Sequence, residues 1–426
     1  MSSEAPSLPA SVPDHRATGR NPEFQAILIP KDTLPHRSDG ALTQVYVEPT
    51  SLCNLDCRIC LRKSWDEATG AMGADTYQNL MEGLRQMPSL RRVSFWGIGE
   101  PLLHPQIASM VAQAKEIGAE TQIITNGLLL DRAKAKGLVE AGLDRLIVSL
   151  DSVSTTSQPD ARSGDQVAQV CQNVSYFREL SRADLPLIAV GSEVKLSPVR
   201  NNPPSHRPEI GVAFVLMKSN LRELKQLRSL AYSLGASSIS VTNLLPYAEE
   251  MRDEILYPFS VGRSYPTEAS QWYPKVSFPR TDVSPELFDA LPELLGFTSS
   301  FGGAEPPDAN RDGYCRFVDE GSIAVNWQGN VSPCVPLMHS YSCYILGRKK
   351  QIKQCVLGNL KTERLNEIWE SSEFERIRRV VRRFPFSPCT DCGGCNLSDT
   401  NEQDCLGNVF PVCGDCLWAK GVIQCP

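Results

Sequence analysis

Apolar and polar positions along this chain follow two patterns in turn, one typical of strands and one typical of helices. Short runs rich in Val, Ile, Thr and Phe predict buried strands. They lie at residues 43–47, 92–96, 121–125, 145–150, 211–217 and 238–242. Apolar residues at helical spacing fill the segments between them, at residues 74–86, 104–117, 131–141, 166–180 and 221–234. This β-α alternation predicts a parallel sheet, either a barrel or a doubly wound sheet.

Other segments interrupt or flank this alternation. Residues 1–40 are rich in Ser, Pro and Ala and predict a flexible arm, without the apolar segment of a secretion signal. The proline-rich stretch 191–208 predicts an inserted loop. Residues 247–310 predict an irregular linker with a short helix at 285–295. We therefore expect a barrel-like domain at 41–246 and a cysteine-rich domain at 311–426.

Composition and charge argue against several classes of function. The net charge of −6 over 426 residues offers no basic field for nucleic acid or an anionic membrane. The chain has no apolar run near the roughly 20 residues that a membrane helix needs. Its 15 cysteines are odd in number, and no export signal accompanies them. In a reducing cytoplasm such thiols predict metal ligands rather than disulfides, so we expect a cytoplasmic metalloprotein.

The first group of cysteines follows the first predicted strand. Cys53, Cys57 and Cys60 have the spacing C-x3-C-x2-C. Because a four-iron cluster normally takes four thiolates, a local set of three leaves one iron without a protein ligand. An open coordination position distinguishes a metal site that does chemistry from one that only holds a fold. A zinc site and structural thiols are the alternatives, and the position at a strand end favours the cluster.

Polar or glycine-rich sequence also follows the next four predicted strands. These positions are Gly99, Glu100, Pro101, Asn126, Ser149, Asp151 and Asn220. Since chemistry in parallel α/β folds gathers at the carboxyl ends of strands, we expect one shared pocket. Plain structural interpretations stay open: a loop for the Gly-Glu-Pro element, a turn for Asn126, and helix caps for the last three residues.

A second group of cysteines lies near the C-terminus. Cys315 is followed by thirteen residues, a glycine, four more residues and then Cys334, and residues 322–330 between the two cysteines predict a hairpin. The tail carries Cys389, Cys392, Cys395, Cys405, Cys413, Cys416 and Cys425. Paired C-x2-C units at this density indicate metal binding, with zinc as the alternative to iron. Three further thiols, Cys171, Cys343 and Cys355, fit no metal-binding pattern, and we interpret them as structural.

The segment from Glu48 to Cys60 resembles the signature of radical S-adenosylmethionine (SAM) enzymes, which have a partial (β/α)6 barrel. The resemblance implies that the three thiolates hold a [4Fe-4S] cluster whose open iron binds SAM. Reductive cleavage then gives a 5′-deoxyadenosyl radical. Ile59 stands where an aromatic residue is frequent in this superfamily.

The resemblance extends to the predicted pocket. Gly99-Glu100-Pro101 is similar to the Gly-Gly-Glu-Pro element, with Ile98 in place of the first glycine. It implies that Glu100 accepts a hydrogen bond from the ammonium group of SAM. Ser149 and Asp151 resemble the positions that meet the ribose or carboxylate of SAM. Asn126 and Asn220 are further candidate SAM contacts.

The C-terminal cysteines resemble a SPASM domain, which holds two auxiliary [4Fe-4S] clusters. Eight thiolates would fill both clusters, and the nine named above are available. The usual order C-x2-C-x5-C-x3-C is not reproduced, so one of Cys392, Cys395 or Cys405 is predicted to be spare.

Within the superfamily, the tail looks similar to that of cofactor-modifying proteins of tungsten-containing aldehyde ferredoxin oxidoreductases. This resemblance implies a maturase that acts on a tungstopterin enzyme or its cofactor, with ferredoxin or flavodoxin as reductant. A maturase that crosslinks a ribosomal peptide is the alternative enzyme. A non-catalytic iron–sulfur or zinc module for binding or electron transfer is the alternative outside enzymes. The sequence identifies no side chain that gives or takes a proton.

Overall fold

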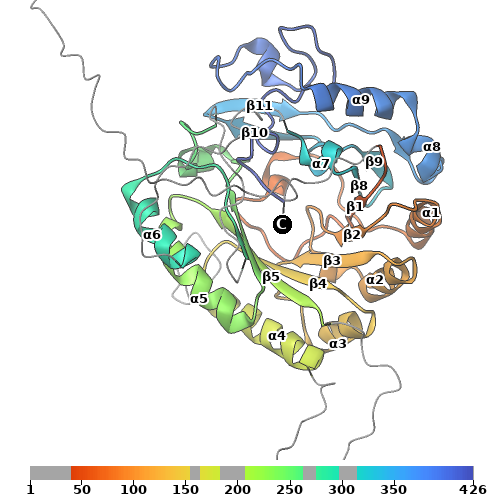
Figure 1. Cartoon of the computed structure of the whole chain (residues 1–426), viewed down its shortest axis with the longest axis vertical. Helices are drawn as coiled ribbons and strands as arrows, with labels where there is room; N and C mark the ends of the chain where they lie inside the picture. The colour runs from red at the N-terminus through yellow and green to blue at the C-terminus, as the bar shows by residue number, and fades with distance from the viewer. Residues whose placement is uncertain (1–39, 154–163, 183–206, 262–274, 297–313, 426) are drawn as a thin grey trace, which may run out of the picture. The chain divides into compact units, whose positions relative to one another are not determined.

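Parallel strands and outer helices alternate through most of this structure, a computed structural model that describes residues 40–153, 164–182, 207–261, 275–296 and 314–425 (Figure 1). Six strands follow one another as parallel neighbours: β1 (Gln44–Val47), β2 (Arg92–Phe95), β3 (Glu120–Thr125), β4 (Arg145–Leu150), β5 (Glu209–Leu216) and β6 (Ser238–Asn243). The helices between them are α1 (Ala74–Leu84), α2 (Ile107–Glu116), α3 (Arg132–Glu140), α4 (Gly164–Arg182) and α5 (Leu224–Leu234).

These helices cover the outer side of a curved sheet, so the fold is a partial barrel rather than a doubly wound sheet (Figure 1). The predicted mixed α/β class is confirmed. The strands are mostly buried on both sides, because helices cover one face and the barrel interior lies on the other. In β4, for example, Leu146 and Val148 pack toward the helices, while Ile147 joins an inner cluster with Ile124 and Ala213.

The sequence predicts an irregular linker at residues 247–310, but its described parts also contain a helix and a strand. The predicted helix at 285–295 is confirmed as α6 (Pro285–Leu295), whose Ser284 side chain accepts a hydrogen bond from the Leu287 N–H. Strand β7 (Lys275–Ser277) pairs in parallel with β6 and extends the sheet. Residues 1–39 and most of the predicted loop at 191–208 lie outside the described residues.

The C-terminal cysteine-rich segment shares the sheet of the barrel. Strand β8 (Ser322–Val325) pairs in parallel with β1, and β9 (Asn330–Ser332) pairs with β8 as the predicted hairpin. Strand β12 (Gly358–Asn359) pairs with β9 and completes a ten-stranded sheet. Residues 35–426 form one compact unit, so the predicted boundary near residue 311 separates two parts of a continuous structure.

Further elements complete the C-terminal part. They are α7 (Arg316–Asp319), the hairpin β10 (Tyr341–Ile345) with β11 (Arg348–Ile352), α8 (Leu365–Trp369) and α9 (Ser372–Arg383). Among the helices of the described residues, none is long and apolar enough to cross a membrane.

Cys171 lies on α4, partly buried against the core. The apolar residues predicted to share its helix face, Val167, Val170, Val174 and Phe177, are all 0% exposed. Its interpretation as a packing residue agrees with this position.

A buried ion pair fixes the last loops to the β10–β11 hairpin. Lys350 Nζ lies 3.0 Å from Asp415 Oδ2, and both side chains are 3% exposed. The same ammonium group donates to the backbone oxygens of Ser398 and Thr400 at 3.0 and 2.7 Å. Because a buried charge without its partner is costly, this pair holds the segment around Asp415 in one position.

Replacing Lys350 by Met should therefore destabilise the protein by about 3 kcal/mol, since Asp415 keeps only the longer contact to Arg348 at 3.4 Å and the two backbone oxygens lose their donor. Urea unfolding followed by tryptophan fluorescence measures the change. Lys349→Met is the matched control because Lys349 is the adjacent, exposed residue of the same strand. Equal stability of the two variants would show that the ion pair does not hold this segment.

Candidate functional site

The loop that follows β1 carries the first three cysteines. Cys53, Cys57 and Cys60 are half-buried thiols that lie between β1 and the 3-10 helix η2 (Leu61–Ser64). The Cys60 N–H donates to the Cys57 oxygen at 3.1 Å, and the Leu55 N–H lies 3.4 Å from Cys53 Sγ. We call residues 50–60 the cluster loop. These two contacts show that its backbone curves around the sulfur atoms of its cysteines.

A cation lies beside these thiols. The Arg62 guanidinium donates to the Leu55 carbonyl oxygen. Burial opposes the charge of Arg62, but a hydrogen bond to the Cys60 sulfur raises its pKa overall. Burial raises the pKa of the Cys53 thiol, so a metal ion would have to displace a firmly held proton there. The positive charge of Arg62 favours thiolates in this loop.

Two glycines allow the turn after β2 to pack directly on the cluster loop. A Cβ atom at Gly99 would lie 2.2 Å from the Thr50 oxygen, and one at Gly97 would lie 2.4 Å from Glu48 Cγ. Both positions therefore exclude a side chain. Ile98 replaces a glycine of the family pattern without such a clash, because its side chain packs in an apolar cluster with Leu61.

Glu100 connects this turn to the end of β3. Its carboxylate is 2% exposed and accepts hydrogen bonds from Thr125 Oγ1 at 2.6 Å, the Asn126 N–H at 2.8 Å and the Leu102 N–H at 3.0 Å. Pro101 begins the short helix η3 (Pro101–Leu103) that follows. A carboxylate has about four acceptor positions. The predicted hydrogen bond from the SAM ammonium would have to use an acceptor position of Glu100 other than those taken by these three donors.

Asn126 both forms a turn and reaches the cluster loop. Its Oδ1 accepts from the Leu128 N–H at 3.0 Å, which is the expected turn. Its Nδ2 donates to Asn54 Oδ1 at 2.9 Å and lies 3.9 Å from Cys53 Sγ. The structure therefore brings this predicted residue next to the cysteine triplet.

Ser149 and Asp151 lie at the end of β4. Ser149 pairs with Ala213 of β5 and is half-buried. Because side chains alternate along a strand, it points to the same side as Ile147, into the barrel interior. Asp151 follows the strand and is also half-buried. Both residues thus lie at the carboxyl end of β4.

Asn220 holds the ends of β4 and β5 together. Its Nδ2 donates to the backbone oxygens of Asp151 at 3.0 Å and Val215 at 2.8 Å, and its Oδ1 accepts from the Met217 N–H at 2.8 Å. Its side chain makes no capping bond to the following helix η4 (Leu221–Glu223), which was the alternative interpretation. A SAM contact would have to use the second lone pair of Oδ1.

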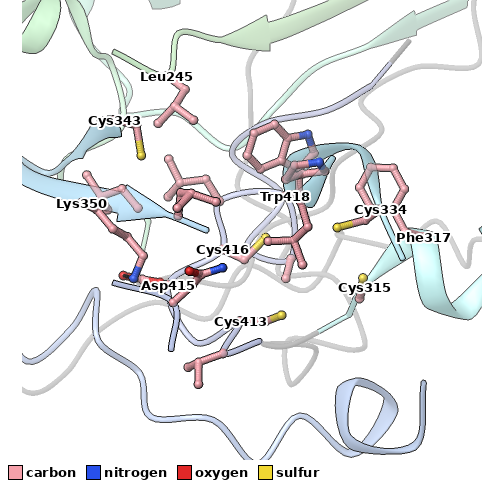
Figure 2. Close-up of a pocket in the computed structure, with 18 of the residues that line it drawn as sticks. Leu245, Cys315, Phe317, Cys334, Cys343, Lys350, Cys413, Asp415, Cys416 and Trp418 are labelled. Carbon is pink, nitrogen blue, oxygen red and sulfur yellow. Dashed lines mark hydrogen bonds and ion pairs between the residues drawn. The ribbon is translucent and has the colours of Figure 1, made fainter. Parts of the chain in front are cut away.

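Four of the nine C-terminal cysteines of the predicted metal set line one pocket. Cys315, Cys334, Cys413 and Cys416 come from three separate parts of the chain, and apolar side chains such as Trp418 surround them (Figure 2). Cys343 lines the same pocket next to Leu245 and Lys350, at a greater distance from the other thiols (Figure 2).

Burial dominates the electrostatics of this pocket. It raises the pKa of Cys315 to about 12 and also raises the pKa values of Cys334, Cys413 and Cys416. Neighbouring thiols contribute to the higher pKa values of Cys315, Cys334 and Cys413, whereas Asp415 is the charged neighbour that raises the pKa of Cys416. Soft sulfur donors that converge in a dry pocket fit an iron–sulfur cluster.

Four thiols are the number that one [4Fe-4S] cluster normally takes. In the part of the chain that the structure describes, no group of three or more His, Cys, Asp or Glu side chains is close enough to hold a single metal ion. A four-iron cluster does not need such convergence, because each thiolate binds a different iron.

The remaining thiols occupy other surroundings. Cys389, Cys392, Cys395 and Cys405 lie in the loops after α9, and all but Cys389 are exposed. Cys425 is 6% exposed and belongs to an apolar cluster with Tyr46 and Met338.

The buried residues Glu48 and His339 and the half-buried Glu67 lie near the site, and sequence reasoning assigned them no role. His339 Nε2 lies 2.9 Å from Glu48 Oε2, and its Nδ1 lies 2.7 Å from Glu67 Oε2. Glu48 directly follows β1 and Glu67 follows the cluster loop, but His339 comes from the C-terminal part. Glu48 is a polar residue directly after an apolar strand, and this position was the sequence signal that could have identified it. No local pattern could have identified its partner 291 residues away.

Comparisons with known proteins agree with this arrangement. Residues 47–190 match the model of the radical SAM superfamily, and residues 315–396 match that of the SPASM iron–sulfur cluster-binding domain. The chain is 30% identical over 386 residues to the tungsten-containing aldehyde ferredoxin oxidoreductase cofactor-modifying protein of Pyrococcus furiosus, covering 90% of this chain and 96% of that protein.

Two further similarities span most of the chain. The PqqA peptide cyclase of Gluconobacter oxydans is 23% identical over 378 residues, covering 87% of this chain and 89% of that protein. A solved structure of histidine-tagged anSMEcpe with bound AdoMet superimposes with a TM-score of 0.52 at 16% identity, over 89% of this chain and 93% of that one. At this identity the superposition shows the fold alone.

The family assignment rests on the full-length relative and on both domain matches. The cysteine triplet lies within the first match, and Cys315 and Cys334 lie within the second. This protein is an enzyme of the radical SAM superfamily with a C-terminal SPASM iron–sulfur domain.

Proposed function

We propose that this enzyme is a maturase that cleaves SAM to a 5′-deoxyadenosyl radical and modifies a tungstopterin oxidoreductase or its cofactor. The observation that carries the proposal is the similarity, over 96% of its length, to a protein named for modifying the cofactor of a tungsten-containing oxidoreductase. The cluster loop, packed on the turn after β2 at the strand ends, supports SAM chemistry at this position.

The residues around the cluster loop have distinct roles in this proposal. When bound on Cys53, Cys57 and Cys60, a [4Fe-4S] cluster supplies the electron that breaks the C–S bond of SAM, after reduction by a ferredoxin or flavodoxin. Arg62 supplies positive charge beside Cys60. Glu100 fixes the 97–101 turn where the SAM ammonium would lie, and Asn126 presents its amide next to Cys53.

Apolar side chains line part of the barrel interior, next to which a radical would form. Ile124, Ile147 and Ala213 form an inner apolar cluster against which Trp96 packs. Trp96 and Tyr46 meet edge to face with ring centroids 6.0 Å apart. Excluding water and side reactions is what a radical intermediate requires of its protein. Ser149 and Asp151 border this space and remain our candidates for the ribose or carboxylate of SAM.

We further propose that the C-terminal part holds two auxiliary [4Fe-4S] clusters. The pocket of Cys315, Cys334, Cys413 and Cys416 supports the first. The second would take the other tail thiols: Cys389, Cys392, Cys395 and Cys405. Under this allocation the spare ninth cysteine is Cys425, and not one of Cys392, Cys395 or Cys405 as expected from the sequence, because Cys425 does not line the pocket.

A peptide-modifying maturase is the second candidate function. It is favoured by the similarity to a PqqA peptide cyclase, which covers 89% of that protein and therefore includes both parts of this chain. The lower identity of 23%, against 30% for the tungsten-related protein, places it second.

Substituting Cys57 by Ala should abolish formation of 5′-deoxyadenosine, because the remaining two thiolates cannot hold a cluster in the SAM-binding position. Chromatography of anaerobic reactions with SAM and dithionite measures this product. Cys171→Ala is the control, since this thiol is half-buried on α4 away from the site. Product formation by Cys57→Ala at the level of Cys171→Ala would contradict the ligand assignment.

Iron analysis tests the proposed allocation of thiols. Reconstituted wild type should contain about twelve irons per chain, as three four-iron clusters require. Cys413→Ala should lower this toward about eight, because it removes one of four ligands from a single cluster. Cys343→Ala should keep the wild-type content, since Cys343 lines the same pocket but is not among the proposed ligands. Loss of iron in Cys343→Ala, or none in Cys413→Ala, would refute the allocation.

The substrate is tested by supplying the two candidates in parallel. With SAM and reductant, an inactive tungstopterin oxidoreductase should gain aldehyde oxidation activity only in the presence of this enzyme. A ribosomal peptide encoded nearby should keep its mass under the same conditions. A peptide that loses hydrogen mass while the oxidoreductase stays inactive would favour the second candidate.

A further inference from the structure

A histidine held between two carboxylates connects the cluster loop to the SPASM domain. We call Glu48, His339 and Glu67 the His339 bridge. The side chains of His339 and Glu48 are 1% and 0% exposed, and that of Glu67 is 20% exposed. The two ring nitrogens lie 2.9 Å and 2.7 Å from the carboxylate oxygens. These are the lengths of charge-assisted hydrogen bonds.

The geometry fits a charged imidazolium. The second oxygen of each carboxylate accepts a backbone N–H, from Ile98 at 2.9 Å for Glu48 and from Ser340 at 2.7 Å for Glu67. Ionised carboxylates only accept, so both ring nitrogens of His339 must donate. Burial alone would lower the pKa of His339, but the hydrogen bonds to Glu48 and Glu67 raise it to about 9.

The bridge contacts the two sides of the cluster loop, the turn after β2 and the segment after Cys334. Glu48 follows β1, supports the turn after β2 through the Ile98 N–H, and leaves no room for a side chain at Gly97. Glu67 lies on the other side of the cluster loop, three residues after η2. His339 follows η6 (Val335–Leu337), the short helix whose N-cap is Cys334.

We propose that His339 is a positioning residue for SAM cleavage: through Glu48 and Glu67 it holds the cluster loop and the 97–101 turn against the segment after Cys334. SAM binding would then weaken whenever this imidazolium is lost or neutralised. The inference rests on the proposed SAM cleavage and extends it to a link between the two parts of the enzyme.

The sign of the pH dependence follows from the charge. The groups that face His339 are Glu48 from the end of β1, Glu67 from the loop after η2, and the uncharged ring of Trp65 at a centroid distance of 4.7 Å. Because the pKa is raised, the stabilisation is complete below the ordinary histidine pKa of about 6.5. It is lost as the pH rises through about 9. The KM for SAM should therefore rise in that alkaline range.

The main test is the KM for SAM in 5′-deoxyadenosine formation by the reconstituted full-length enzyme. His339→Gln should raise this KM about tenfold near neutral pH, because one buried carboxylate loses its donor, while kcat and iron content change little. The variant should also lack the alkaline rise of KM that the wild type shows.

Two further variants make the test specific. His104→Gln is the matched control: His104 is another buried histidine, but its ring contacts the Met72 oxygen and the Gln106 N–H rather than carboxylates. It should keep the alkaline rise. Glu67→Gln should move the rise to lower pH, because the imidazolium loses one anionic partner.

The proposal is overturned if His339→Gln keeps the wild-type KM and pH profile, or if Glu67→Gln leaves the alkaline rise where it was. Should His339→Gln fail to fold, the shift in Glu67→Gln decides alone. A wild type that forms no 5′-deoxyadenosine would instead refute the proposed function. The bridge would then be tested by 15N-histidine NMR, in which protonation of both His339 ring nitrogens near neutral pH supports it and one bare nitrogen overturns it.

Discussion

The close packing of the 97–101 turn on the cluster loop is the constraint on which the rest of this site depends. The backbone of Gly99 passes so near the Thr50 oxygen that no Cβ atom fits between them. The Glu100 N–H then donates to the Leu52 oxygen at 2.8 Å, and the Glu100 carboxylate carries the connection on to β3. A cofactor bound by three thiols in a loop needs such support, because loops alone do not fix atoms to the accuracy that chemistry requires.

The continuous sheet extends this support to the C-terminal cysteines. The strands between Cys315 and Cys334 belong to the same sheet as β1, because β8 pairs with β1. The cluster loop follows β1 in the chain. The His339 bridge and the Lys350–Asp415 pair are polar connections buried within this frame. Buried charges of this kind are poor sources of net stability, but they favour one arrangement over others. Here the His339 bridge links the segments around the cluster loop to the C-terminal part, and the Lys350–Asp415 pair links two segments within that part.

Much of the fold could be predicted from the sequence because its signals are local. The strands β1 to β6 show as apolar runs, and α6 begins after a capping serine and ends before a glycine. Polar residues after a strand were expected to lie at the carboxyl-end edge of the sheet, and Asn126 and Glu100 lie there. The pairing of β8 with β1 had no such signal, since it joins strands far apart in sequence through backbone hydrogen bonds that any residues can make.

The site could be predicted in part, for the same reason. The three N-terminal cysteines lie close in sequence, so their spacing indicates a shared ligand. The pocket that joins Cys315 and Cys334 to Cys413 and Cys416 depends on how the tail folds back, which no spacing encodes. The same holds for His339, whose partners come from the other end of the chain. Asn220 shows the limit of reasoning from position, because its amide mainly bonds to backbone groups.

The central claim is that one iron near Cys53, Cys57 and Cys60 is open to SAM. An EPR spectrum of the dithionite-reduced enzyme, recorded with and without SAM, tests it most directly. The account predicts that SAM changes the signal of the reduced cluster in the wild type and that no such change occurs in Cys57→Ala. A wild-type spectrum that SAM leaves unaltered would contradict it.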